Sequence, residues 1–268
     1  MKLLKENTNT LTDKLKLSNN LKSFLGSSDF KEMLNDYDID NIYKYTSSDL
    51  FSVKDVRNLT QILYSIGVDP LNYLTYVPSY FLGGMDSTIN ISIPNNITSI
   101  SEYAFTNCSG LTSITIPDSV ISIGERAFAS CENLADIIIP NSVISIGSGA
   151  FDACSSLKSI TIPDSVTSIG KYVFRYCSNL HTVTINSSIT EINTGFAQVC
   201  ENLTEVFIPK TVLTIGSYSF SDCPSLREIR YNGTKQEWRK IEKHGAWKTA
   251  SPIQTIHCVD GDINYKVL

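Results

Sequence analysis

The sequence lacks the long apolar and strongly charged segments that mark several classes of protein. No stretch approaches the roughly 18 continuous apolar residues of a membrane-spanning helix. No block of about five like charges occurs, and the 22 Lys and Arg against 27 Asp and Glu leave a formal net charge of −5. Sequence-independent nucleic-acid binding requires a basic surface. We therefore expect neither a membrane span nor a nucleic-acid partner.

The N-terminal residues also lack the features of a targeting signal. Two early lysines are followed by Glu6, Asn7 and Asn9, where a secretory signal needs about 7 to 15 continuous apolar residues. No lipidation motif and no C-terminal sorting motif is present. The sequence therefore predicts an unprocessed protein, with the cytoplasm as the default location.

Cysteine reveals the organisation of the chain. Six of the seven cysteines follow one another at intervals of 23 residues, and only Cys258 lies outside this series. Leucines from Leu111 to Leu226 keep the same step, as do prolines from Pro94 to Pro209, with Asn186 in one of the proline positions. A period of 20 to 29 residues headed by L-x-x-L-x-L predicts a leucine-rich-repeat solenoid. The fold class is therefore an α/β repeat solenoid of six 23-residue coils.

The residue types of one copy predict the path of one coil. Leu111, Ile114 and Ile116 are expected to point inward, with Ser113 and Thr115 alternating outward as on a strand. Stacked copies of this strand would form a parallel sheet. Proline at the next position supplies no N–H to a ladder and should end the strand. The repeated glycine, as at position 124, is expected to take a positive φ at the following corner.

Both ends of a solenoid need covers, because an end coil leaves an open edge. We assign residues 1–25 to a flexible arm or attachment segment, 26–85 to a helical N-terminal cap module, 86–232 to the solenoid and 233–268 to a C-terminal cap. Two capping boxes of the form [ST]-x-x-[DE] support helices in the caps, at Ser52 with Asp55 and at Thr234 with Glu237. The Asp260-Gly261 dipeptide predicts a closing hairpin.

The repeats resemble a known family. The units ITIPDSVISIGERAFASCENL and ITIPDSVTSIGKYVFRYCSNL are similar to the BspA-like, or type 5, leucine-rich repeats, over residues 91–232. The tail YNGTKQEWRKI resembles the closing unit of that class. The resemblance implies a curved solenoid with no catalytic role. It also implies kinship with bacterial surface proteins that bind host proteins or matrix, and with proteins of protozoa and bacteriophages. A virion-associated location, or a surface location by another route, follows as an expectation.

The sequence predicts no enzyme, no catalytic residue, no cofactor and no metal site. Zinc sites need short C-x-x-C spacings, and none occurs. In-register side chains point the same way, whereas a disulfide needs Cβ atoms about 3.8 Å apart. Disulfides between coils are not excluded by distance alone. We interpret the repeated cysteines as a buried structural column that donates weak S–H bonds between coils. Its members are Cys108, Cys131, Cys154, Cys177, Cys200 and Cys223.

The surface best placed to carry function is the outward face of the parallel sheet. Most of its residues are small and polar, but Ile138 and Phe207 would expose apolar groups. Residues 86–232 contain 7 Lys and Arg against 13 Asp and Glu, which favours a basic partner surface. The candidate binding-face residues are Ser113, Thr115, Asp136, Ile138, Ser159, Thr161, His181, Thr182, Thr184, Glu205, Phe207, Glu228 and Arg230.

These observations leave more than one function open. A flat array of coils suits macromolecules better than metabolites, so the first hypothesis is a non-enzymatic protein-binding or scaffold module whose partner is another protein. The alternative is a structural or assembly component, such as a bacteriophage particle protein anchored by residues 1–85. A bacterial surface adhesin is a second alternative. A solvated face without a partner also fits, because threonine is a good exposed strand residue.

Overall fold

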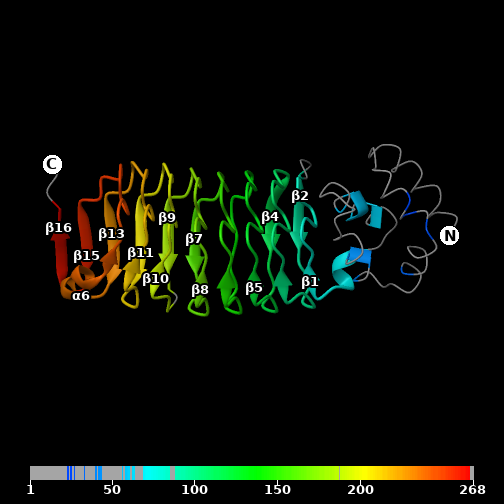
Figure 1. The fold of residues 1–268 in the computed structure, drawn as a ribbon, viewed down its shortest axis with the longest axis horizontal. Helices are drawn as coiled ribbons and strands as arrows, with labels where there is room; N and C mark the ends of the chain where they lie inside the picture. The colour runs from blue at the N-terminus through cyan, green and yellow to red at the C-terminus, as the bar shows by residue number, and fades with distance from the viewer. Residues whose placement is uncertain are drawn as a thin grey trace.

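The computed structural model describes residues 69–84, 88–186 and 188–265, together with isolated residues between 23 and 63. Coils stack side by side into an elongated rod, with the C-terminal hairpin at one end (Figure 1). The sequence therefore predicted the fold class correctly: a solenoid of stacked parallel coils that repeats every 23 residues. No helix in the described part of the chain is long and apolar enough to cross a membrane.

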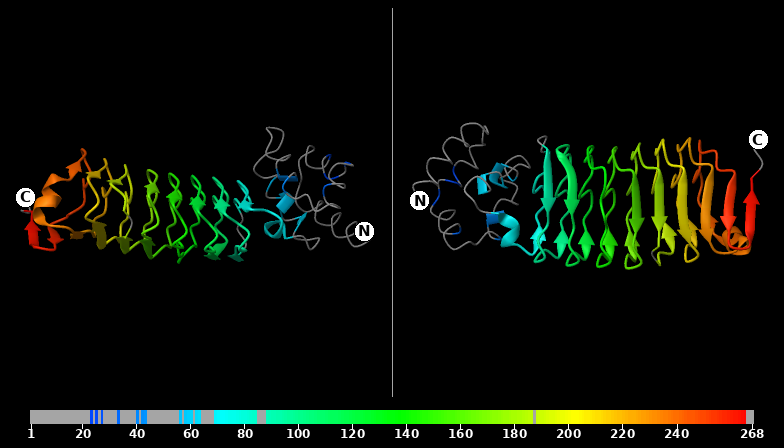
Figure 2. Two further views of the ribbon diagram at one scale, coloured as in Figure 1. Left: turned by 90° about the horizontal axis from the view of Figure 1, so that it is seen from below. Right: turned by 180° about the vertical axis from the view of Figure 1, so that it is seen from behind.

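The strands predicted from the leucine positions form one long face, which we call the main sheet; it is seen in a row in the right-hand view of Figure 2. Neighbouring strands are parallel, apart from the antiparallel terminal pair β15 and β16. The strands are β2 (Ile89–Ser92), β4 (Leu111–Thr115), β7 (Ser159–Ile162), β9 (Thr182–Ile185), β11 (Glu205–Pro209), β13 (Glu228–Asn232), β15 (Thr255–Cys258) and β16 (Gly261–Asn264).

A second row of strands, which we call the narrow ladder, is built from the Ser-Ile dipeptide of each repeat or its replacement. Each strand has two residues, too few to show the alternation from which a strand is predicted. The first segment holds β1 (Tyr76–Val77), β3 (Ser99–Ile100), β5 (Ser122–Ile123), β6 (Ser145–Ile146) and β8 (Ser168–Ile169). The second holds β10 (Glu191–Ile192), β12 (Thr214–Ile215) and β14 (Glu242–Lys243).

The two rows are interrupted at different coils. In the main sheet, the coil between β4 and β7 makes only an isolated bridge between Ser113 and Asp136, while the narrow ladder continues through β5, β6 and β8. The narrow ladder stops between β8 and β10, where the main sheet continues from β7 to β9. A third line of backbone hydrogen bonds runs along the Ala-Phe turns through both places, for example from Phe151 N to Val173 O at 3.0 Å and from Phe174 N to Phe196 O at 2.8 Å.

A column of phenylalanines fills the centre of the rod. From Phe105 to Phe174 the rings stack with centroids 5.1 to 5.6 Å apart and interplanar angles of 2° to 9°. The next coil reverses the repeat, with Phe196 followed by Ala197 instead of alanine followed by phenylalanine. Its ring consequently enters from the preceding position and meets Phe174 at 83°. The core is continuous, but its ring packing changes at this coil.

The predicted role of the repeat glycine is wrong. Gly124 has no positive φ; the left-handed residue lies two positions later, at Arg126 with φ of 49°. A Cβ added to Gly124 would overlap the backbone nitrogen of Glu102 in the preceding coil. Glycine is therefore needed because two coils approach closely, and the strained conformation falls on the residue that turns the corner.

The C-terminal end is covered by helix α6 (Lys235–Lys240) and by the β15–β16 hairpin. Thr234 and Glu237 form the capping box that the sequence predicted. Trp238 is buried, with its ring centroid 5.2 Å from that of Tyr231 and 6.4 Å from that of Trp247. The short helix thus lays a large apolar side chain over the last coil.

The N-terminal cap shares a core with the coils. The rings of Tyr43 and Phe81 lie 6.2 Å apart, and the Tyr76 hydroxyl donates to Asp40 Oδ1 at 2.9 Å. The 3₁₀ helix η1 (Pro70–Asn72) and strand β1 precede residue 86, so the coil architecture begins within the segment assigned to the cap. The predicted capping box at Ser52 and Asp55, and nearly all of the arm assigned to residues 1–25, lie outside the described residues.

Candidate functional site

Strand register aligns the outward side chains of the main sheet into two rows. Thr161, Thr184, Phe207, Arg230 and His257 lie opposite one another on successive strands and form what we call the Phe207 row. Two residues earlier on each strand, the Glu205 row contains Ser159, Thr182, Glu205, Glu228 and Thr255. Small polar residues occupy the N-terminal part of both rows, and the charged and aromatic residues gather toward the C-terminal hairpin.

Phe207 and Arg230 form one unit on this face. The Arg230 guanidinium carbon lies 5.7 Å from the centre of the Phe207 ring, and Arg230 Nε donates to Glu205 Oε1 at 2.7 Å. Phe207 was predicted to be an exposed apolar group, but it is half-buried, because Arg230 on the next strand lies over its ring. The ion pair with Glu205 fixes the guanidinium in this position.

His257 completes the Phe207 row at the hairpin. Its Nε2 lies 3.2 Å from Glu228 Oε2, and its Nδ1 lies 2.9 Å from Asp262 Oδ1. The bond to Asp262 first, and then the bond to Glu228, raise the pKa of His257 above its ordinary value. His257 was not predicted as a face residue, because it follows Arg230 by 27 residues and not 23. The alternation of T-I-H-C matches that of E-I-R-Y and could have identified it.

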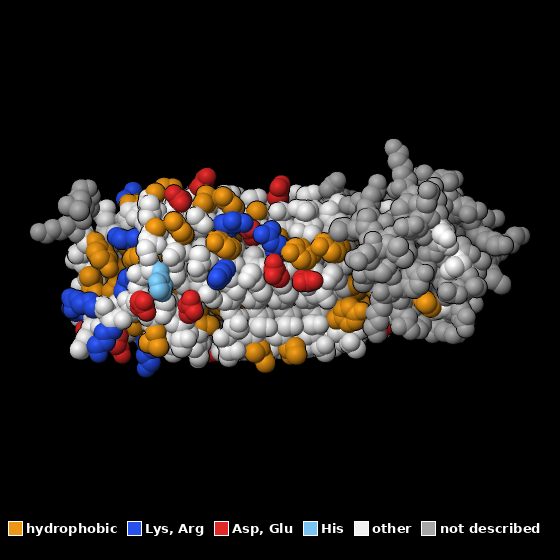
Figure 3. Space-filling model, in the orientation of Figure 1, with side chains coloured by type: hydrophobic (Ala, Val, Ile, Leu, Met, Phe, Trp, Pro, Cys, Tyr) orange, Lys and Arg blue, Asp and Glu red, His pale blue; other side chains and the backbone are white. Residues whose placement is uncertain are grey.

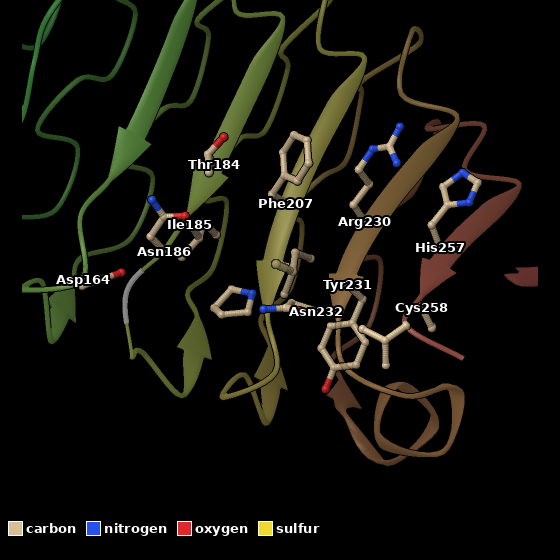
Figure 4. Close-up of a pocket in the computed structure, with 13 residues that line it drawn as sticks. Asp164, Thr184, Ile185, Asn186, Phe207, Arg230, Tyr231, Asn232, His257 and Cys258 are labelled. Atoms are coloured by element: carbon tan, nitrogen blue, oxygen red, sulfur yellow. The ribbon is translucent and has the colours of Figure 1, made fainter. Parts of the chain in front are cut away.

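A groove of about 640 Å³ lies between the Phe207 row and the ends of the strands (Figure 4). Thr184, Phe207, Arg230 and His257 form one side, side by side on four neighbouring strands. Exposed polar residues at the strand ends, among them Asp164, Asn186 and Asn232, line the other side. The groove offers hydrogen-bonding groups along one border and an aromatic ring with a guanidinium along the other.

A second hollow of about 680 Å³ continues the groove toward the N-terminus. It includes Asp136, Ile138 and Thr161, and it shares Asp164 and Asn186 with the first. Ile138 is 81% exposed, as the sequence predicted for an outward position. This isoleucine belongs to the coil that leaves the main sheet, so an apolar side chain stands beside an interruption of the strand pairing.

The remaining candidates are less closely grouped. Ser113 lies on β4 and donates to Asn90 Oδ1 at 2.9 Å, and Thr115 ends that strand. His181 is exposed and immediately precedes the first residue of β9, and its Nδ1 lies 2.7 Å from Asn179 O. It therefore belongs to neither of the two rows, which on β9 contain Thr182 and Thr184.

The cysteine column lies inside the rod, away from this face. All six members are buried, and Cys131, Cys154, Cys177, Cys200 and Cys223 each donate to a carbonyl of the preceding coil at 3.1 to 3.2 Å. These five have free thiols. Burial raises the pKa of Cys154 to about 12. Within the described ranges, no three metal-ligating side chains gather closely enough to hold an ion.

Proteins of known structure share the stacked-coil fold of this chain. A Treponema pallidum leucine-rich repeat protein of known structure is 30% identical; the match covers 57% of this chain and 72% of that chain, with a TM-score of 0.54. The pneumococcal vaccine antigen PcpA is 20% identical over 67% of this chain and 43% of that chain, with a TM-score of 0.50. A Bacteroides ovatus leucine-rich repeat protein is 24% identical over 70% and 59%, with a TM-score of 0.49. This chain thus spans less than two thirds of the last two. No curated protein matches the sequence.

The family comparison covers most of the chain. Six copies of the BspA type leucine-rich repeat region match overlapping segments, at residues 6–134, 75–202 and 122–244. These segments together extend over well more than half of the 268 residues, and the chain therefore belongs to the BspA type leucine-rich repeat family.

Proposed function

We propose that the protein is a non-enzymatic protein-binding or scaffold module that binds its partner through the outward face of the main sheet. The observation that carries this proposal is the Phe207–Arg230 stack, fixed by Glu205 at the border of the groove. Aromatic and arginine side chains supply much of the binding energy at protein interfaces. An arginine already held in place loses less conformational freedom when a partner binds.

The dimensions of the face favour a macromolecule. From Thr161 to His257 the Phe207 row crosses four interstrand steps, about 19 Å at roughly 4.8 Å per step. The two adjoining hollows follow this row, and Figure 4 shows the lining of the first. Small-molecule sites are typically enclosed and bury most of the ligand. Leucine-rich repeat families are also generally non-enzymatic, which supports a binding role.

The charge of the face favours a partner with a basic surface. Glu205 pairs with Arg230, whereas Glu228 and Asp262 both contact His257, so the three carboxylates and the guanidinium carry a net charge of −2 when His257 is neutral. Complementary charge on a partner speeds association and orients it. On the side of the rod shown in Figure 3, acidic and basic side chains are interspersed.

A matched pair of variants tests the proposal. Ile138→Ser with Phe207→Ser removes the apolar groups of the face, whereas Leu213→Ser removes a side chain that is 63% exposed just before narrow-ladder strand β12. Proteins captured by the purified chain from the cells that produce it would be quantified by mass spectrometry. We expect a partner retained by wild type and by Leu213→Ser but lost with the double variant.

Circular dichroism and thermal melting would verify that each variant folds. A folded double variant that captures every protein at wild-type level would show that the face is not the binding site.

A further inference from the structure

The charged residues at the end of the main sheet are linked diagonally from strand to strand. Glu205 on β11 binds Arg230 on β13, and Glu228 on β13 binds His257 on β15. In each case the basic residue lies one strand further and two residues later than the glutamate it contacts. His257 then reaches Asp262 on β16, the edge strand. The links thus cross every strand from β11 to the edge.

His257 is the one link whose bonding depends on a proton. Ionised carboxylates only accept hydrogen bonds, and both ring nitrogens of His257 face a carboxylate oxygen. Only the imidazolium form donates from both nitrogens, whereas the neutral ring donates from one. A proton gained or lost at His257 therefore makes or breaks a connection between β13 and β16.

The other charged groups near His257 come from each element packed around it. Arg230 lies beside it on β13, Cys258 follows it on β15, and Asp260 lies in the turn to β16. Helix α6 supplies Lys235, whose backbone N–H donates to Asp260 Oδ1 at 2.7 Å, and Arg239. Asp262 and Glu228 are the carboxylates that contact the ring directly.

We propose that His257 is a proton-dependent clasp that fastens the edge strand β16 to β13 and thereby regulates the binding face. Strand β16 pairs with β15 only. The side-chain hydrogen bonds of His257 to Asp262 and to Glu228 therefore connect β16 with β13, the strand beyond β15. Opening of the clasp would loosen the hairpin that borders the groove and change the charge of the face by one unit. The effect on binding rests on the function proposed above; the clasp itself does not.

The direction follows from the pKa of His257, which the carboxylates raise above the ordinary value of 6.5. A group with a raised pKa in the folded state contributes its full stabilisation below the unfolded-state value. That contribution is lost as the pH rises through the higher folded-state value. The clasp is therefore closed in mild acid and opens on the alkaline side of 6.5.

The test measures the clasp without a partner. Histidine NMR titration would give the pKa of His257 in the full chain, and amide hydrogen exchange would give protection factors for β15 and β16 at about pH 5.5 and about pH 8.5, on either side of the ordinary histidine value. Amides of β7 and β9 serve as the internal control. We expect protection in β15 and β16 to fall about two- to fivefold at the higher pH, the range of an exposed ion pair, with no fall in the control strands.

Two variants should remove this pH dependence, one by leaving the clasp open at both pH values and the other by keeping it closed. His257→Gln cannot carry the charge and should give the weaker protection at both values, whereas His257→Lys keeps a charge and should give the stronger protection at both. A pH-dependent loss that persists in His257→Gln would overturn the clasp, as would equal wild-type protection at the two values or a pKa of His257 at or below 6.5. These results do not depend on partner capture, so the clasp and the binding proposal can fail separately.

Discussion

Arg175 donates two hydrogen bonds to the carboxylate of Asp152 in the preceding coil, from Nε to Oδ1 at 3.1 Å and from Nη2 to Oδ2 at 2.6 Å. The Asp152 side chain is only 9% exposed, whereas that of Arg175 is 27% exposed. The guanidinium also lies over the rings of Tyr172 and Tyr176, at 4.9 and 5.1 Å from their centres. One ion pair therefore joins two coils on the side formed by the Ala-Phe turns.

Removal of Arg175 should destabilise the protein more than removal of both partners. Arg175→Leu leaves the Asp152 carboxylate almost buried and unpaired, and we expect a loss of about 2 to 3 kcal/mol in the free energy of unfolding. Asp152→Ala combined with Arg175→Leu should recover part of this loss, because alanine occupies the equivalent position one repeat earlier, at residue 129. Urea denaturation measures both; equal losses would contradict the expectation.

Gly147 should tolerate alanine far less well than Gly245. A Cβ on Gly147 would overlap the backbone nitrogen of Glu125, whereas a Cβ on Gly245 would meet nothing within 4 Å. We expect Gly147→Ala to cost about 1 to 3 kcal/mol or more, and Gly245→Ala to change the free energy of unfolding by less than about 0.5 kcal/mol. Thermal melting of the two variants decides the matter, and similar melting temperatures would show that the coils can shift apart.

The cysteines should divide into one accessible thiol and a protected column. Burial raises the pKa of Cys154 to about 12 and that of Cys177 well above its ordinary value, so few thiolates form there at neutral pH. The hydrogen bond to Cys200 lowers the pKa of Cys223, and burial raises that of Cys258, so access and not pKa separates these two thiols. Cys258 is half-buried in the groove. We expect brief treatment of the native protein with an alkylating reagent to modify Cys258 first, and the column to react only after denaturation.

Mass spectrometry of proteolytic fragments would locate each adduct. Rapid native alkylation of Cys154 would contradict the protected column. An intact mass lowered by pairs of hydrogens in the absence of reductant would show disulfides in its place. Cys154→Ala should cost about 1 kcal/mol for the small cavity that it leaves.

The capping box of α6 gives a prediction with a defined pH dependence. Hydrogen bonds from the backbone and the hydroxyl of Thr234 lower the pKa of Glu237 below its ordinary value of 4.5. A lowered folded-state pKa contributes stability above the unfolded value, and this stability is lost as the pH falls through the folded-state value. We expect Thr234→Ala to destabilise by about 1 kcal/mol at neutral pH, and by less below pH 4.5.

Denaturation curves at both pH values would check the cap. Glu237→Gln provides the control, because its side chain cannot lose a charge. A pH dependence unchanged in Glu237→Gln would assign the effect to another carboxylate.

The period of 23 residues predicted most of the coil, because identical residues at identical positions must take equivalent places in a stacked structure. It could not predict His257, since the inserted helix lengthens that interval to 27. The strands of the narrow ladder were not predicted, because a strand of two residues shows no alternation of apolar and polar side chains. Residues 137–139 fit the inward and outward pattern, yet the strand does not form there; we find no local feature of the sequence that explains this.

The binding face was predicted in outline but not in its contacts. Outward positions follow from alternation within one strand, whereas the cover of Arg230 over Phe207 is a contact between two coils. Phe207 and Arg230 are 23 residues apart and therefore lie side by side on neighbouring strands. Contacts of this kind can be predicted once the strand register is known.

The staggered interruptions of the main sheet and the narrow ladder have a mechanical consequence. Tension along the rod acts across the hydrogen bonds between coils, and at each interrupted boundary one row still bears load together with the line of bonds at the Ala-Phe turns. Among the described coils, no boundary therefore loses the pairing of the main sheet and of the narrow ladder together. Under force we expect the coils to unfold one after another from an end, and not to separate at a boundary in the middle. Each coil that unfolds would lengthen the chain while the remaining coils stay stacked.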